Sequence, residues 1–224
     1  MLKGIYEQYR GACMLLLRQE NEAVVFMGTA FVVHPEGYML TAAHLLNDMR
    51  EVMVAPRNFE DEFAPPWSET VTPMAAMVCA MDKEHDVALL RFKEMHELSM
   101  PDHVIGVPEE IPMGSQVACL GYPFGHYKVF NQFIQGGIVT SKMRSRNETN
   151  LFLFDTPMND GLRGGPLVNV YDGRIIGVAG GWFQPEEAMG LPLDETSAKR
   201  RIFGYAMSIE YGTRLLEAEG VEAV

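Results

Sequence analysis

The sequence predicts an all-β protein of the barrel class, on three observations. Short strand-like runs recur along the chain, with turn residues between them. These runs fall into two groups of six, and a stretch rich in Pro, Glu and Gly separates the groups. The 224 residues, of which 47% are hydrophobic, suit a globular unit of this size without a large additional domain.

Each predicted strand is an apolar run bounded by turn signals. In the first half the runs are 12–18, 23–33, 38–41, 51–55, 75–81 and 87–92, and in the second half they are 116–122, 133–142, 151–155, 166–170, 174–180 and 203–207. We therefore expect an N-terminal barrel with a short leading segment over residues 1–100. A connection over residues 101–114 then leads to a C-terminal barrel and terminal helix over residues 115–224.

Three segments fall outside this strand pattern. Residues 208–224 have the amphipathic spacing of a helix, with Ile209, Leu215 and Leu216 facing inward. Residues 56–73 and 184–201 are polar and rich in Pro or Glu, so we interpret them as surface insertions. The aromatic pair at 182–183, just before the second insertion, is either partly buried or available to dock a peptide.

The segment Asp160-Gly-Leu-Arg-Gly-Gly-Pro-Leu-Val-Asn169 is the most informative part of the chain. Acyl transfer by serine needs an activated hydroxyl, a histidine base, an orienting carboxylate and backbone N–H groups that face the developing oxyanion. A turn rich in glycine supplies such N–H groups, because glycine reaches backbone angles that other residues avoid. Gly161, Gly164 and Gly165 meet this demand, whereas position 163 carries arginine and has no hydroxyl.

A histidine and a carboxylate that could complete such a site precede this turn in the chain. His44 follows the apolar run 38–41, at the point where a barrel loop is expected to begin. Asp86 stands at the start of the apolar run 87–92. The predicted cleft then has His44 and Asp86 on the first barrel and position 163 on the second.

These segments resemble the trypsin-like serine peptidases, and in particular the bacterial HtrA-type branch. The matching segments are 28–45, 86–92, 121–125, 136–139, 155–169 and 204–207. The resemblance implies two six-stranded antiparallel β-barrels of the chymotrypsin type. It also implies that His44 is the general base, that Asp86 is the orienting acid and that the backbone N–H groups of Gly161 and Arg163 are oxyanion donors. The implied substrate-pocket wall consists of Phe203, Gly204, Tyr205, Ala206 and Met207.

Arg163 departs from the family pattern at the nucleophile position. A guanidinium stays protonated at ordinary pH and has no lone pair for attack on a carbonyl. Its charge would also disfavour protonation of His44, which the mechanism requires. Other hydroxyls and a thiol occur at Ser145, Thr156, Ser208 and Cys119, but none lies in the glycine-rich turn. We expect Arg163 to pair with Asp160 or Asp86 and to occupy the cleft.

Three functions are compatible with these residues. The first is a pseudoprotease that binds a protein or peptide, or serves as a structural subunit, without cleaving. The second is a serine endopeptidase with a His44–Asp86–Ser triad, in which arginine was introduced artificially or as a variant. The third is a regulated protein whose cleft Arg163 closes, which reduces to the first unless another nucleophile is recruited.

Composition restricts partners and location. A formal charge of −12 argues against a nucleic acid or an anionic membrane as partner, because both favour basic surfaces. Cys13, Cys79 and Cys119 do not form a disulfide pattern, and no Cys/His spacing typical of a metal site appears. The first ten residues lack an apolar signal core. We therefore expect no cofactor or metal and a cytoplasmic location; the oligomeric state is not predicted.

Overall fold

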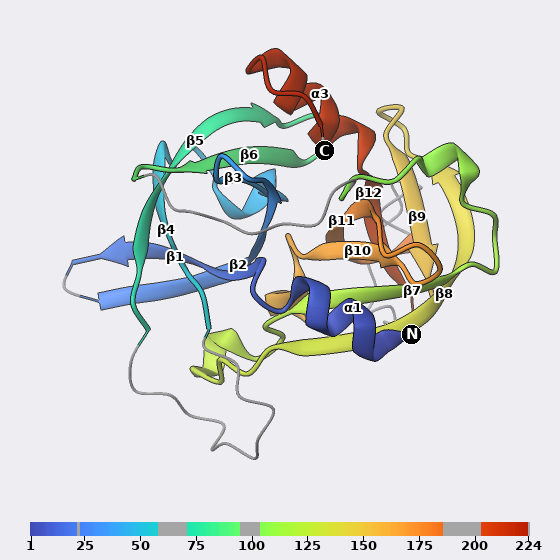
Figure 1. The fold of residues 1–224 in the computed structure, drawn as a ribbon, viewed down its shortest axis with the longest axis horizontal. Helices are drawn as coiled ribbons and strands as arrows, with labels where there is room; N and C mark the ends of the chain where they lie inside the picture. Colours follow the sequence, from blue (N-terminus) through green and yellow to red (C-terminus); the bar gives the residue numbers. More distant parts are fainter. Residues whose placement is uncertain (22, 58–70, 95–103, 186–202, 224) are drawn as a thin grey trace.

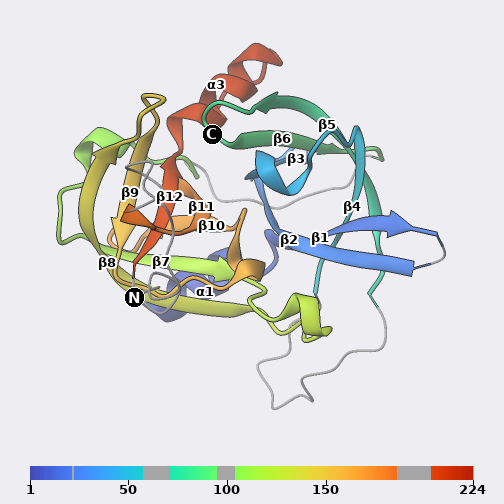
Figure 2. The same cartoon turned by 180° about the vertical axis from the view of Figure 1, so that it is seen from behind.

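The computed structural model describes residues 1–21, 23–57, 71–94, 104–185 and 203–223. Two closed six-stranded antiparallel β-barrels lie side by side, as Figure 1 and, from behind, Figure 2 show. The predicted fold class is therefore confirmed. Most of the insertions predicted at 56–73 and 184–201 lies outside the described residues.

The first barrel contains six strands in the order β1-β2-β3-β6-β5-β4. Their bounds are β1 Cys13–Glu20, β2 Ala23–His34, β3 Tyr38–Ala42, β4 Glu51–Ala55, β5 Met74–Asp82 and β6 Val87–Phe92. Each strand pairs antiparallel with its neighbours, and β1 with β4 closes the barrel.

The second barrel repeats this connectivity in the order β10-β11-β12-β9-β8-β7. Its strands are β7 Gln116–Gly121, β8 Phe133–Arg144, β9 Asn150–Phe154, β10 Pro166–Asn169, β11 Ile175–Trp182 and β12 Gly204–Ser208. The pairing of β10 with β7 closes this barrel.

Apolar side chains of one strand serve two different cores. Along β1, Leu15 and Leu17 belong to a large cluster that includes residues of both barrels. Met14 and Leu16 point the other way, into a cluster confined to the first barrel. This alternation is the two-residue period of a strand that is buried on both faces. The shared cluster joins the barrels, so the loops at their junction are held in fixed relation.

Each terminal helix packs on the barrel at the opposite end of the sequence. Helix α1 (Leu2–Tyr9) lies beside β7 and β8 of the second barrel in Figure 1. Its buried residues Ile5 and Tyr9 are one helical turn apart, and the Tyr9 hydroxyl donates to the Gly173 carbonyl at 2.5 Å. The sequence did not predict this helix, because its docking depends on a turn that is distant in the chain.

Helix α3 (Glu210–Ala218) packs against β5 and β6 of the first barrel. It is shorter than the predicted helix over 208–224. Ser208 belongs to β12, and Gly220 ends the helix at a positive φ of 76°. Ile209 and Leu216 are buried as predicted, whereas Leu215 is only partly buried.

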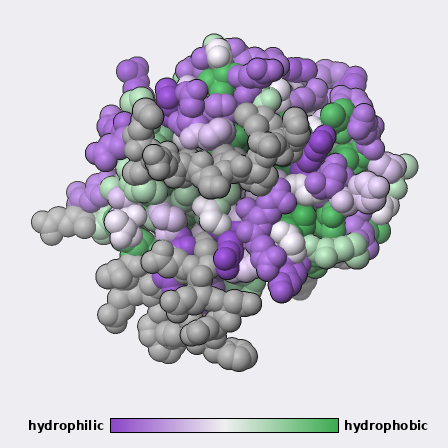
Figure 3. Space-filling model, in the orientation of Figure 1, coloured by the Kyte–Doolittle hydropathy of each residue, from purple (hydrophilic) through white to green (hydrophobic). Residues whose placement is uncertain are grey.

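The face of the molecule in Figure 3 and the lengths of the helices bear on contact with a membrane. Hydrophilic residues predominate on the face in Figure 3, and the hydrophobic areas are scattered between them. Within the described ranges, every helix is too short or too polar to cross a bilayer.

Candidate functional site

His44 and Asp86 meet because they flank the paired ends of two strands. Ala42, the last residue of β3, pairs with Val87, the first residue of β6. His44 follows in the 3₁₀ helix η1 (Ala43–Leu45), and Asp86 directly precedes β6. The His44 ring Nδ1 lies 2.7 Å from Asp86 Oδ2, and the His44 backbone N–H donates to Oδ1 at 2.7 Å. The carboxylate therefore fixes the imidazole ring, and its Nε2 remains on the opposite side.

Asp86 is presented by a tight turn with unusual backbone geometry. Its φ is 58°, in the left-handed region that Asp and Asn tolerate better than most residues. The same turn holds a second histidine–carboxylate pair, in which His85 Nδ1 lies 2.7 Å from Asp82 Oδ2. The His85 ring stacks on Tyr211 of α3, with centroids 4.1 Å apart. The turn is thus anchored to the C-terminal helix.

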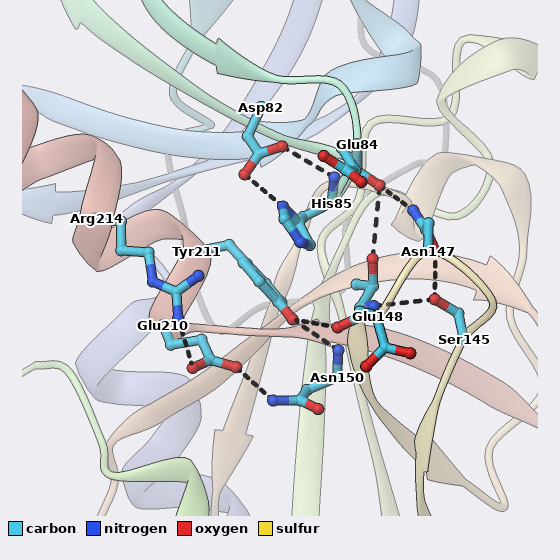
Figure 4. A network of polar contacts seen from close by, with 11 residues as sticks. Asp82, Glu84, His85, Ser145, Asn147, Glu148, Asn150, Glu210, Tyr211 and Arg214 are labelled. Atoms are coloured by element: carbon cyan, nitrogen blue, oxygen red, sulfur yellow. Dashed lines mark hydrogen bonds and ion pairs between the residues drawn. The ribbon is translucent and has the colours of Figure 1, made fainter.

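A hairpin of the second barrel also holds this turn, as Figure 4 shows. Asn147 Nδ2 and, at 3.5 Å, Thr149 Oγ1 donate to the Glu84 carbonyl. The Tyr211 hydroxyl accepts the N–H of Asn150 at 2.7 Å. Because the network joins a β5–β6 turn, a β8–β9 hairpin and α3, it keeps Asp86 in place from both barrels.

Thr29 of β2 pins the glycine-rich turn of the second barrel to the first. Its hydroxyl donates to the Gly161 carbonyl at 2.7 Å and accepts the Tyr122 N–H at 3.2 Å. Its backbone N–H donates to the Arg163 carbonyl at 2.9 Å. Since Thr29 is fully buried, each of these bonds replaces water that the groups would otherwise need.

The glycines of the turn are required by close packing. A Cβ at Gly161 would lie 2.0 Å from the Tyr122 carbonyl oxygen. A Cβ at Gly164, where φ is 80°, would lie 2.2 Å from the Thr29 carbonyl oxygen. The motif therefore lets the turn approach the backbone of its neighbours, which is a packing demand in addition to N–H presentation.

The Arg163 side chain lies in the cleft and pairs with an acid, as the sequence predicted. Its Nη2 is 2.9 Å from Asp160 Oδ1, and its side chain is 26% exposed. The guanidinium Cζ lies 4.4 Å from the centroid of the Trp182 ring. Trp182, the residue for which the sequence left two interpretations open, thus provides the surface on which the arginine rests.

The two predicted oxyanion residues lie in or beside the 3₁₀ helix η4 (Asp160–Leu162). The Arg163 N–H donates to the Asp160 carbonyl at 3.2 Å, so this N–H is engaged within the turn. Gly161 is buried, and its carbonyl faces Thr29.

A cleft of about 590 Å³ brings several predicted residues together. His44, Asp86, Arg163, Tyr205 and Met207 all line it. The other predicted wall residues lie elsewhere: Gly204 packs against Phe154 and Met158, Ala206 is buried, and Phe203 is 41% exposed.

The alternative nucleophiles are poorly placed. Burial raises the pKa of the Cys119 thiol to about 12, which suppresses the reactive thiolate. Thr156 and Ser208 are buried outside the cleft, and the Thr156 hydroxyl donates to the Gly136 carbonyl. Ser145 does line the cleft, but its hydroxyl is bonded to Asn147 in the hairpin.

The arrangement of possible ligand side chains in the described part of the chain does not indicate a metal site. Among the residues that the structure describes, no three His, Cys, Asp or Glu side chains gather as ligands would.

Sequence reasoning missed Thr29 and Tyr122. A threonine inside a strand is typical of any sheet, and its second-barrel partners are far away in the chain. The glycines at 121 and 161 were the one feature of the sequence that could have indicated a close contact with Thr29. A Cβ at Gly121, for example, would lie 2.5 Å from the Thr29 hydroxyl.

Comparison with known proteins agrees with this geometry. The family described as "Trypsin-like peptidase domain" matches residues 28–178. A probable periplasmic serine endoprotease DegP-like from Pseudomonas fulva is 30% identical over 155 residues, which cover 68% of this chain and 28% of the relative. A protein of the same name from Chlamydia pneumoniae is 28% identical and is matched over 29% of its length. The chain therefore spans less than a third of these curated relatives.

Solved structures show the same fold. The HtrA-type protease AlgW with tripeptide has a TM-score of 0.73 at 21% identity, over 97% of this chain and 63% of that one. A serine endoprotease from Yersinia pestis has a TM-score of 0.69 at 19% identity, over 97% and 66%.

The expected cytoplasmic location is contradicted by these relatives, which are named periplasmic. The expectation rested on unpaired cysteines, as an indicator of a reducing compartment, and on the lack of an apolar signal core in the first ten residues. Cys13 and Cys119 are fully buried free thiols. Burial shields a thiol from oxidants and from other thiols, so unpaired cysteines of this kind are compatible with an oxidising compartment.

Proposed function

Since the chain belongs to the family of trypsin-like peptidase domains, we propose that it is a pseudoprotease: a domain of HtrA type that binds a protein or peptide without cleaving it. The observation that carries this proposal is the position of Arg163. Its backbone lies in the glycine-rich turn that the family resemblance predicts to be the nucleophile turn, and its guanidinium lies in the cleft against Trp182. A permanent cation without a hydroxyl provides no acyl acceptor.

The remaining parts of the site support a binding role for the cleft. The His44–Asp86 pair has hydrogen-bond geometry, and the cleft beside it has a volume of about 590 Å³. Loss of the triad serine costs roughly 10⁶-fold in kcat in a serine peptidase of unrelated fold that uses the same triad, and the residual activity comes from binding and the oxyanion hole. We therefore assign recognition rather than turnover to this cleft.

A serine endopeptidase is the second candidate, and the intact His44–Asp86 bond favours it. In that case the parent protein has serine at position 163, and the sequence of its gene would show this. The periplasmic names of the relatives also lead us to propose a periplasmic location for this chain, which fractionation of the source bacterium tests.

The proposal is tested with a fluorophosphonate probe and unfolded casein. We expect no labelling and no cleavage by the native chain, labelling by the Arg163→Ser variant and none by Arg163→Ala. The alanine control separates loss of the nucleophile from blockage, because it empties the cleft without adding a hydroxyl. Labelling of the native chain would refute the proposal.

A further inference from the structure

Arg163 places a stacked and only partly paired cation inside the cleft. The Arg163 guanidinium has five N–H donors, and one of its terminal nitrogens pairs with the Asp160 carboxylate. Asp160 is itself 56% exposed, so this ion pair is partly screened by water. The guanidinium Cζ lies over the Trp182 ring, and Nε is buried without a hydrogen-bond partner, so a ligand would bond to the terminal nitrogens. This arrangement suits a planar, bidentate anion.

We propose that the cleft binds a peptide by its C-terminal carboxylate, with Arg163 as the carboxylate receptor; this rests on the proposed peptide-binding function. In a serine peptidase the nucleophile lies next to the carbonyl carbon of the bound peptide. A peptide that ends at that point brings its terminal carboxylate to residue 163. The arginine then meets a carboxylate where an enzyme would attack a carbonyl.

The rest of the cleft determines which peptide side chains can precede the C-terminal carboxylate. Leu151, Trp182, Phe183, Tyr205 and Met207 supply apolar and aromatic lining. This lining favours apolar side chains in the last positions of the peptide.

Acidic side chains elsewhere in the peptide are disfavoured. Glu84 and Asp86 also line the cleft, and the whole chain has a formal charge of −12. Like charges at short range disfavour binding. The predicted ligand is thus a peptide with one negative charge, at its C-terminus, after uncharged apolar residues.

Isothermal titration calorimetry with three tetrapeptides tests this assignment. The first is acetyl-Ala-Ala-Phe-Leu with a free C-terminus, the second is its C-terminal amide, and the third is acetyl-Ala-Ala-Phe-Glu amide. We expect the free acid to bind roughly 10- to 100-fold more tightly than its amide, the range for a hydrogen bond to a charged group. Tight binding of the glutamate amide would overturn the terminal assignment.

Three variants locate the effect at Arg163. Arg163→Gln should remove the preference for the acid over the amide, whereas Arg50→Gln, the same change at an exposed arginine outside the cleft, should preserve it. Asp160→Asn should tighten binding of the free acid, because it removes a competing carboxylate from the guanidinium. A purely structural role of Asp160 would predict weaker binding or no change.

The result separates this inference from the proposed function. Equal binding of acid and amide would overturn carboxylate recognition and leave a peptide-binding pseudoprotease. Binding of none of the three peptides by a folded, probe-unreactive chain would likewise overturn it. Cleavage of any tetrapeptide, detected by mass spectrometry, would instead refute the pseudoprotease itself.

Discussion

The two barrels contribute unequally to the cleft. On the first barrel, the Asp86 carboxylate holds His44 with two bonds of 2.7 Å, and a network anchored on Tyr211 supports the turn. On the second barrel, the glycine-rich turn retains its packing but presents Arg163. The difference teaches that the packing of a turn and the chemistry of the side chain it presents are separable. Contacts with Thr29 and Tyr122 fix the turn, whereas the side chain at position 163 decides what the turn offers to the cleft.

The strongest way to sharpen this comparison is to restore serine and then damage the first barrel. In an Arg163→Ser background, Asp86→Asn should reduce kcat by about 10⁴-fold, because His44 loses its orienting acid. In the native background the same change should have no effect, because no turnover of the ester is expected there. Steady-state kinetics on a peptide ester measures both. A loss of less than tenfold would show that the pair does not act as a catalytic unit.

Damage to the turn of the second barrel should have the next largest effect. Gly164→Ala should lower the free energy of unfolding by about 2–5 kcal/mol, through overpacking against Thr29 and a left-handed backbone. Gly220→Ala is the matched control, because φ is 76° there and nothing lies within 4 Å of the added Cβ. The control should cost about 1–2 kcal/mol. Equal losses in urea unfolding would mean that the turn is not tightly packed.

Thr29 links the two regions, and its hydroxyl is the next target. Thr29→Val should lower the free energy of unfolding by about 1–3 kcal/mol, because it leaves the Gly161 carbonyl and the Tyr122 N–H without partners. Thr140→Val, which removes a partly buried hydroxyl bonded to the Leu153 carbonyl within one barrel, should cost less. If both variants unfold at the same urea concentration, the inter-barrel role of Thr29 is wrong.

The smallest effect is expected at the ion pair in the cleft. Asp160→Asn should change the free energy of unfolding by less than about 1 kcal/mol, because exposed ion pairs contribute little. Glu148→Gln, which removes an exposed pair with Arg144, should behave similarly. A much larger loss at Asp160 would indicate a structural role for Arg163 rather than one in recognition.

The sequence predicted most of the strands because each one is marked locally, whereas the two six-stranded barrels were implied by the family resemblance. Apolar runs bounded by Pro, Gly, Asn and Asp mark nearly every strand. The same local signals placed His44 and Asp86 beside apolar runs, and the structure brings the two side chains together. Their catalytic roles were implied by the family resemblance and stay predictions. The ion pair of Arg163 with Asp160 was also predictable, because three residues separate them in a tight turn.

What the sequence missed depends on distant contacts. Helix α1 docks through Tyr9 on Gly173, and Thr29 bridges to Gly161 across the barrel junction. The stacking of Arg163 on Trp182 likewise requires β11 to end beside the turn. The predicted location was wrong for a different reason, because unpaired cysteines and the composition of the first ten residues are weak indicators of compartment.

Intact-mass spectrometry of the native chain during incubation with an activated ester tests the central claim most directly. The account predicts an unchanged mass for the native chain and a single acyl adduct on the Arg163→Ser variant. A covalent acyl adduct on the native polypeptide, at any residue and lost again on turnover, would contradict it.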